Sequence, residues 1–419
     1  MFRTGAQMLL LALLAGLFLL RESHRLPGST LEDRWVDLLG AAVRRTPPAV
    51  PPVTLVAIDD HSLKNHPFPW TPLDYSLFFP AALTFHPDVL AVCEILNWDN
   101  ATTDAAQRQK LGQYERILKD VILRSPKTVL GATLGYPDDP QAIPALQGTP
   151  IIRRVTGDLR QVPEWTVIES QPAESFRLSA TLGFMNVPGA AKYHNSAPLV
   201  LRYRGHVVPS FVLQSALLWH KLGTDDIEVV LGSHVALGPK VRVPIDERGQ
   251  MRVNFAVPRT VFSFEDLLLA AEQFAAKQTP TIPAERLRKG TTILARTDAE
   301  ARTLPVLGRP NISPGELFSS ALATIHTRWY ITRAPEWVDW AIIATVALVS
   351  LWIPRLRRRI VVALAVLGLL AYAGAAYYFY WRQLMWLPAL LPLGLCLFVV
   401  LYRMVTPRWA AKPRRPVLL

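Results

Sequence analysis

The stretch Val53-Thr-Leu-Val-Ala-Ile-Asp-Asp60 decides the fold of the central part of this 419-residue chain. Its first six residues lack the polar alternation of a half-exposed strand, and Thr54 is the only polar residue among them. An unbroken apolar run of this length, rich in β-branched residues, is typical of a strand that is buried on both faces. Such strands occur in parallel sheets that helices cover on both sides, so the stretch predicts an α/β domain.

The same rhythm continues along the chain. Further buried strands are expected at residues 89–95, 128–134 and 291–295, and helices at 72–85, 103–124, 210–222, 264–276 and 315–327. Strands that alternate with helices favour a mainly parallel sheet flanked by helices, and we assign this domain to residues 21–336. Ser263 stands where the N-cap of the helix at 264–276 is expected, and Asp246-Glu-Arg-Gly249 predicts a hairpin turn.

Four apolar runs lie outside the domain, at residues 6–20, 337–353, 360–380 and 384–404. Their composition predicts four transmembrane helices, and because several are short we expect them to form a bundle. The first run is not followed by a small-x-small cleavage site, so we interpret it as an uncleaved anchor. Residues 405–419 are predicted to be a short cytoplasmic tail, too short for a catalytic output domain.

Charge is divided unevenly between the domain and the apolar runs. The chain carries 45 Lys and Arg against 33 Asp and Glu, a net charge of +12, but residues 21–336 hold 34 against 32. Because the domain is almost neutral, the basic excess does not indicate nucleic-acid binding. The excess flanks the apolar runs, at Arg3 and within 355–359 and 403–415. The positive-inside rule then predicts a multi-pass protein of the inner (cytoplasmic) membrane, with both termini in the cytoplasm and the domain in the periplasm.

Motifs for catalysis or metal binding do not occur in the sequence. Cys93 lies in the domain and Cys396 in the last apolar run, so we expect no disulfide. No Cys/His metal spacing, Walker loop or Gly-x-Ser-x-Gly motif is present, and we expect no metal, no cofactor and no enzymatic activity. The apolar runs have almost no ionisable residues in their middle, which favours anchoring and signal transmission over transport.

Several segments occur in an order that is familiar from one family. They are Leu31-Glu-Asp-Arg-Trp-Val-Asp37, Val56-Ala-Ile-Asp-Asp-His-Ser-Leu63, Pro69-Trp70, Val92-Cys-Glu94, Gly183-Phe-Met-Asn186, Gly249-Gln-Met-Arg-Val-Asn-Phe255 and Pro314-Gly-Glu316. With three apolar runs after them, they resemble the CHASE2 family of extracytoplasmic sensory domains. The resemblance implies sensing outside the cytoplasm.

The chain departs from the family pattern in three ways. Ile293-Leu-Ala-Arg-Thr297 lacks the glycine that commonly follows the last strand, and Phe318-Ser-Ser320 stands where His-Ala is common. Family members usually carry a cyclase or kinase domain after the third of these runs, and we expect none in residues 405–419. We therefore expect any output to come from a separate protein.

Acidic residues follow two of the predicted strands. Asp59 and Asp60 end the first strand and Glu94 ends the second. Because ligands of open α/β sheets bind at the carboxyl ends of strands, these acids predict a site for a small ligand or cation, with Ser62 and Trp70 nearby. The prediction requires the two strands to be neighbours. The alternative interpretation is structural, in which the acids cap the following turns or pair with a nearby Arg or Lys.

These features favour a membrane-anchored extracytoplasmic sensor without catalysis. It would bind a small extracytoplasmic ligand or a periplasmic protein, contact the lipid bilayer, and relay a signal through its helices to a partner in the cytoplasm or the membrane, as a monomer or a homodimer. A periplasmic scaffold for envelope assembly is the alternative from another class, and a membrane-tethered hydrolase is a third.

Overall fold

The computed structural model describes residues 2–25, 30–43, 45, 49–98, 104–125, 127–136, 149–188 and 193–405. The chain forms two compact units, one made of Thr46–Tyr330 and the other of Met1–Arg45 with Ile331–Leu419. The predicted tail lies outside the described residues apart from position 405. The α/β unit therefore covers fewer residues than the predicted 21–336, because residues 21–45 and 331–336 belong to the helical unit.

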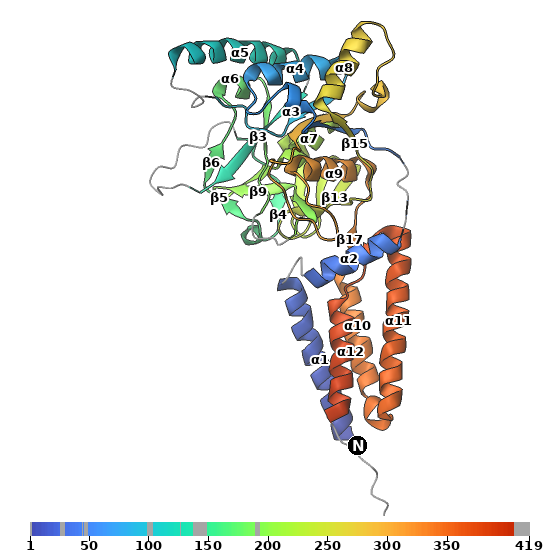
Figure 1. The fold of residues 1–419 in the computed structure, drawn as a ribbon. Helices are drawn as coiled ribbons and strands as arrows, with labels where there is room; N and C mark the ends of the chain where they lie inside the picture. Colours follow the sequence, from blue (N-terminus) through green and yellow to red (C-terminus); the bar gives the residue numbers. More distant parts are fainter. Residues whose placement is uncertain are drawn as a thin grey trace, which may run out of the picture. The chain divides into compact units, whose positions relative to one another are not determined.

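A mainly parallel sheet forms the centre of the α/β unit (Figure 1). Within the described residues its strands follow the order β15 (Thr260–Ser263), β1 (Val53–Ile58), β16 (Thr291–Arg296), β2 (Val89–Val92), β3 (Lys127–Gly135) and β6 (Val167–Ser170), and β7 (Thr181–Phe184) also pairs with β3. Every pair is parallel except that of β3 with β6. The predicted fold class, a mainly parallel sheet flanked by helices, is confirmed for this unit.

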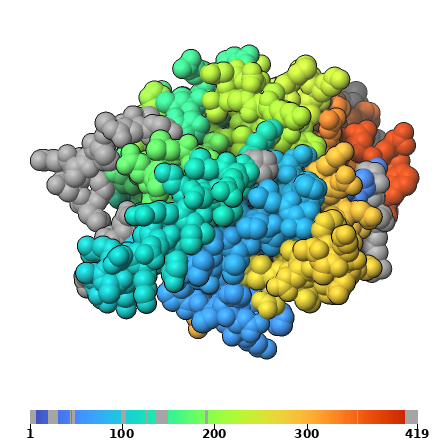
Figure 2. All heavy atoms as spheres, turned by 90° about the horizontal axis from the view of Figure 1, so that it is seen from above, coloured from blue at the N-terminus to red at the C-terminus, as the bar shows by residue number. Residues whose placement is uncertain are grey.

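Helices cover both faces of the sheet, as the apolar strands require. The helices α7 (Phe211–His220) and α9 (Pro314–Thr327) pack on one face, while α4 (Pro72–Leu83) and α8 (Phe264–Ala275) cover the other, with α5 (Ala105–Arg124) packed on α4. Alternate residues of β1 point to the two sides: Leu55 belongs to the core under α7 and α9, and Val56 to the core under α4 and α8. On the face seen in Figure 2, the residues around α4 (blue) lie beside those of α8 (yellow).

Short elements complete the α/β unit. Three small sheets are described: β10 (His206–Pro209), β9 (Val200–Tyr203) and β5 (Glu164–Trp165); β13 (Val241–Pro244), β12 (His234–Leu237), β11 (Ile227–Val230) and β4 (Val155–Thr156); and β14 (Gln250–Arg252) with β8 (Ser196–Pro198). The short helices are α3 (Ser62–Asn65), α6 (Glu174–Arg177), η1 (Leu159–Gln161), η2 (Thr224–Asp226) and η3 (Ala284–Arg286).

One local prediction is wrong, and a second is confirmed in position only. The turn at 246–249 forms, since Asp246 Oδ1 accepts hydrogen bonds from the amides of Arg248 and Gln250, at 2.9 and 2.8 Å. The strands beside it do not form a hairpin, because β13 pairs with β12 and β14 pairs with β8. Ser263 does occupy the N-cap position of α8, but its side chain makes no capping hydrogen bond and binds Asp59 instead.

The helical unit contains α1 (Phe2–Arg25), α2 (Thr30–Ala42), α10 (Glu336–Ser350), η4 (Ile353–Arg355), α11 (Arg358–Gln383) and α12 (Leu390–Val405), with the short strands β17 (Thr332–Arg333) and β18 (Met385–Trp386). The four long helices α1, α10, α11 and α12 form a bundle, and α2 lies across one end of it (Figure 1). Small residues allow the helices to approach closely. Gly16 of α1 is an example, because a side chain there would overlap Ile343 of α10.

The prediction of four spans is only partly supported by helix length. Among the described residues, α11 is the one helix long and apolar enough to cross a membrane by itself. The apolar helices Gln7–Leu19 and Leu390–Met404 are shorter, and α10 has 15 residues. A lone helix needs about 20 apolar residues to cross the hydrocarbon core. The structure thus shows one spanning candidate where the sequence predicts four.

Close helix–sheet contact gives a stability test. A methyl group at Gly315, in the first turn of α9, would overlap the side chain of Ala295 in β16. Gly315→Ala should therefore lower stability by about 1–3 kcal/mol through overpacking. Gly112→Ala is the matched control, because nothing lies within 4 Å of its Cβ position on α5. It should leave stability unchanged or raise it by up to about 1 kcal/mol. Denaturant unfolding of the purified chain compares the two, and equal effects would contradict the packing of α9 on β16.

Candidate functional site

The predicted site residues lie along the carboxyl edge of the central sheet, but not as direct neighbours. Asp59 follows β1 and Glu94 follows β2, as expected. The strand β16 lies between β1 and β2, so the end of β16 separates the two carboxylates. The assumption that the two strands pair is wrong, because the strand that separates them comes much later in the chain.

Asp59 organises the turn that follows β1. Its Oδ1 accepts hydrogen bonds from the Ser62 amide (2.9 Å), the Ser62 hydroxyl (2.7 Å) and the Ser263 hydroxyl (2.9 Å). Burial alone would raise the pKa of Asp59, but the hydrogen bonds from Ser62 and Ser263 outweigh it and hold the pKa below its usual value. Asp59 and Ser62 thus connect α3 to the end of β15, and a ligand contact at these residues stays a prediction.

Asp60 and Trp70 also have partners within the fold. The Asp60 carboxylate accepts a hydrogen bond from the Ala299 amide at 3.2 Å. Trp70 is 2% exposed, and its indole N–H donates to the His66 carbonyl at 2.8 Å. Its ring packs on Phe264 with centroids 4.7 Å apart. Trp70 is therefore part of the core beneath the edge of the sheet, and a ligand would have to displace side chains to reach its ring.

Glu94 differs from the other acids because few groups stabilise its charged form. Its carboxylate accepts one long hydrogen bond, 3.3 Å, from the Arg296 amide at the end of β16. The Arg296 guanidinium turns to Asp298 instead, with N–O distances of 2.8 and 2.7 Å, and lies 3.8 Å from the centre of the Phe68 ring. Burial raises the pKa of Glu94 to about 7, although the hydrogen bond and charge of Arg296 oppose it.

The sequence reasoning missed Arg296, Asp298 and Tyr75, which surround Glu94. Tyr75 is buried, and burial together with the Glu94 charge raises its pKa well above 10. A signal for Arg296 was available, because it stands in the segment 293–297 where the chain departs from the family pattern. A carboxyl group that titrates near neutral pH beside an arginine can bind a hydrogen-bond donor or a cation in a pH-dependent way. Among the described residues, no group of three or more His, Cys, Asp or Glu is placed to hold a metal ion.

A second arrangement lies in the helical unit, at the α11–α12 link, which we define as residues 384–389. The residues that follow the α/β unit bind it: the Thr332 amide donates to the Leu384 carbonyl (3.1 Å) and the Ala334 amide donates to the Trp386 carbonyl (2.9 Å). These bonds belong to the parallel pair of β17 and β18.

The residues that precede the α/β unit bind the same link. Glu32 of α2 accepts hydrogen bonds from the amides of Ala389 (3.0 Å) and Leu390 (2.8 Å). Trp35, also on α2, donates its indole N–H to the Leu387 carbonyl at 3.0 Å. The first amides of a helix have no partner within the helix, and a carboxylate there is favourable. Glu32, which is 8% exposed, supplies that partner to α12 from a helix that is remote in sequence.

The fold defines a class of protein: a mixed α/β domain on a chain that also carries an apolar helix able to cross a membrane. The CHASE2 domain model matches residues 9–352, and the chain belongs to the CHASE2 family. This match confirms the resemblance seen in the sequence. CHASE2 domains are extracytoplasmic sensory domains. No curated protein and no solved structure matches the chain.

The pKa of Glu94 gives a pH test. The pKa of Glu94 is about 7 in the folded state, and its usual value is 4.5. Between these pH values the folded state binds more protons than the unfolded state, so the free energy of unfolding falls as pH rises through 7. Glu94→Gln removes that loss. The variant should gain on the order of 1 kcal/mol over the wild type at pH 8 relative to pH 5.

Denaturant unfolding of the purified chain at both pH values measures this difference. Glu285→Gln is the control, since Glu285 is exposed on the same unit. A Glu94→Gln difference that is the same at pH 5 and pH 8 would show that Glu94 is not held in its neutral form.

Proposed function

We propose that this chain is a membrane-anchored extracytoplasmic sensor that relays ligand binding through its helices to a separate signalling partner. The observation that carries the proposal is the double attachment of the α11–α12 link. Residues just before the α/β unit bind the link through Glu32 and Trp35, and residues just after the unit bind it through Thr332 and Ala334. A change in the separation of the two ends of the unit would therefore act on one short segment between two helices.

The membrane arrangement that we propose has four crossings, with both termini in the cytoplasm and the α/β unit in the periplasm. Charge supports this topology, because residues 355–359 and 403–415 are rich in Arg and Lys. Packing supports it too, since α1 contacts both α10 and α12. Helices shorter than the hydrocarbon core are accommodated by local thinning of the bilayer and by association with other helices.

Relay requires two states of the bundle and a ligand that binds one of them better. The ligand would be a small extracytoplasmic molecule or a periplasmic protein. The partner that responds to the state of the bundle would be a protein in the cytoplasm or the membrane. The position of Glu32 supports this view, because a carboxylate that caps a helix from another helix holds only while the two remain in register. Loss of these hydrogen bonds would free the start of α12. In this proposal the α/β unit acts by binding and not by catalysis.

The topology predicts the result of reporter fusions. A reporter that is active only in the cytoplasm should be active after Leu419 and when inserted between Arg357 and Arg358, in the link between α10 and α11. It should be inactive when inserted in the α11–α12 link, after Leu387. Activity at this last position, or its absence at either of the other two, would contradict four crossings.

The relay predicts an effect of Glu32 on the opposite end of the bundle. Spin labels at Arg357→Cys and Met404→Cys, both exposed, report the separation of the ends of α11 and α12 once Cys93 and Cys396 are replaced by alanine. Glu32→Ala should shift or broaden the distance distribution measured by pulsed electron resonance in lipid nanodiscs, because α12 loses its cap.

Glu336→Ala is the matched control for this experiment. It removes the same charge from an exposed position in the first turn of α10 and should leave the distances unchanged. If Glu32→Ala also left them unchanged, the bundle would behave as a rigid anchor, as expected of a scaffold and not of a relay.

A further inference from the structure

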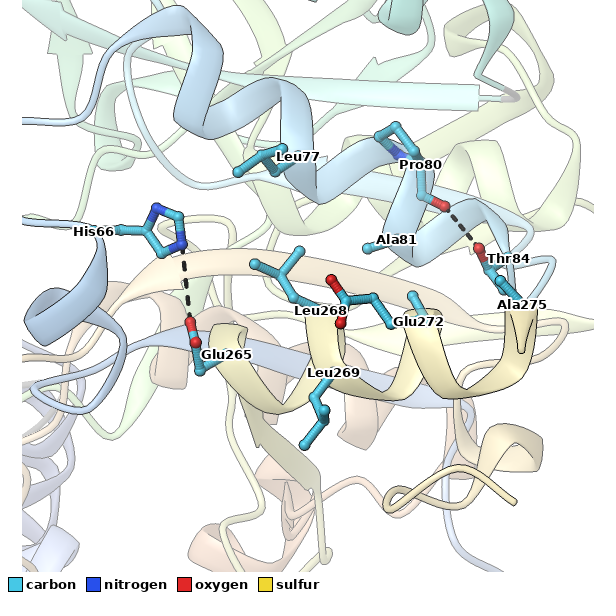
Figure 3. Close-up of a pocket in the computed structure, with 11 residues that line it drawn as sticks. His66, Leu77, Pro80, Ala81, Thr84, Glu265, Leu268, Leu269, Glu272 and Ala275 are labelled. Atoms are coloured by element: carbon cyan, nitrogen blue, oxygen red, sulfur yellow. Dashed lines mark hydrogen bonds and ion pairs between the residues drawn. The ribbon is translucent and has the colours of Figure 1, made fainter. Parts of the chain in front are cut away.

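A groove lies between α4 and α8 on the α/β unit, with a volume of about 560 Å³ (Figure 3). Apolar side chains from both helices line it, among them Leu77 and Pro80 of α4 and Leu269 of α8. Leu77 is 38% exposed and Leu269 is 46% exposed. A hollow of this size falls within the range of small-molecule sites, which is roughly 300–1,000 Å³.

The groove is negatively charged. Glu265 and Glu272 of α8 line it, and no Lys or Arg occurs among the described residues that do. Glu265 and Glu272 are seven residues apart, so they lie on the same face of α8 with their Cα atoms roughly 10 Å apart along the axis. Figure 3 shows both carboxylates on the side of α8 that faces α4. Asp74, at the start of α4, adds a third carboxylate near this end, 3.5 Å from the His66 ring.

One oxygen of Glu265 accepts no hydrogen bond from the described residues. Oε1 accepts a hydrogen bond from the Asn65 side chain at 2.8 Å. Oε2 is buried, and no described residue donates a hydrogen bond to it. The Nε2 atom of His66 lies 3.9 Å from Oε2, beyond hydrogen-bond distance. A carboxylate oxygen without a hydrogen-bond donor is costly, and the Glu265 side chain is still 29% exposed, so this end of the groove suits a bound ammonium group.

We propose that the groove binds an elongated organic cation of the linear diamine or polyamine class. One ammonium group binds at Glu265 beside His66 and Asp74, the alkyl chain lies on the apolar walls, and a second ammonium group binds at Glu272. The inference rests on the proposed sensor function, for which it names a ligand class and a site apart from the edge at Glu94. A protein helix is the alternative occupant, but the small volume and the paired carboxylates on one helix favour the smaller ligand.

Calorimetry on the purified full-length chain tests the site with two probes of equal length. The linear diamine diaminooctane carries both charges, and the uncharged octanediol has the same alkyl chain. We expect the diamine to bind and the diol not to bind. Glu265→Gln and Glu272→Gln should each weaken diamine binding about tenfold, because each removes a charge-assisted hydrogen bond. Asp266→Asn is the matched control, since Asp266 is exposed on the same helix and does not line the groove.

Equal binding of diol and diamine, no binding of the diamine, or equal loss in Asp266→Asn would each overturn the proposal. The spin-labelled chain separates this outcome from failure of the relay. Diamine binding without a change in the distance between positions 357 and 404 supports the site and contradicts the relay. Absence of diamine binding overturns the site and leaves the relay to be driven by another ligand.

Discussion

The hydrogen bonds from the start of α12 to Glu32 join three parts of the helical unit: α2, the α11–α12 link and α12. They satisfy amides that α12 cannot satisfy itself, and they fix α2 to the α11–α12 link. The pairing of β17 with β18 fixes the chain that leaves the α/β unit to the same link. One short segment of the helical unit is therefore bound both by residues that precede the α/β unit in the chain and by residues that follow it. In the relay that we propose, a domain movement would act on this segment.

The architecture of the α/β unit restricts where a ligand can act. Helices bury both faces of the sheet, so accessible chemistry is confined to strand ends and to grooves between helices. At the carboxyl edge most polar groups bind one another: Asp59 is held by Ser62 and Ser263, and Asp298 by Arg296. Among the described residues, Glu94 and Glu265 differ from this pattern, because burial raises the pKa of Glu94 to about 7 and one oxygen of Glu265 accepts no hydrogen bond.

Local sequence predicted the long buried strands and the larger helices of the α/β unit, but not α2, the edge strand β15 or the order of the strands in the sheet. The apolar run 53–58 predicted β1 with its observed ends, because burial on both faces leaves a clear pattern. The position of β16 between β1 and β2 depends on contacts between distant segments, which no local pattern contains. The sequence correctly placed Ser263 at the N-cap position of α8, but it could not predict that the Ser263 hydroxyl binds Asp59, at the end of the adjacent strand β1. Glu32 stands in one of the family segments, but no local pattern predicts its role, because its partners at 389 and 390 are remote in sequence.

The most direct test of the central claim measures whether the two attachments of the α11–α12 link depend on each other. Thr332→Pro removes the amide that donates to the Leu384 carbonyl and leaves Glu32 intact. Hydrogen exchange of the full chain in nanodiscs then reports the Ala389 and Leu390 amides, which Glu32 binds. The account predicts that their exchange becomes faster in Thr332→Pro, because both ends of the domain act on one segment. Exchange at these two amides that stays at the wild-type rate would contradict it.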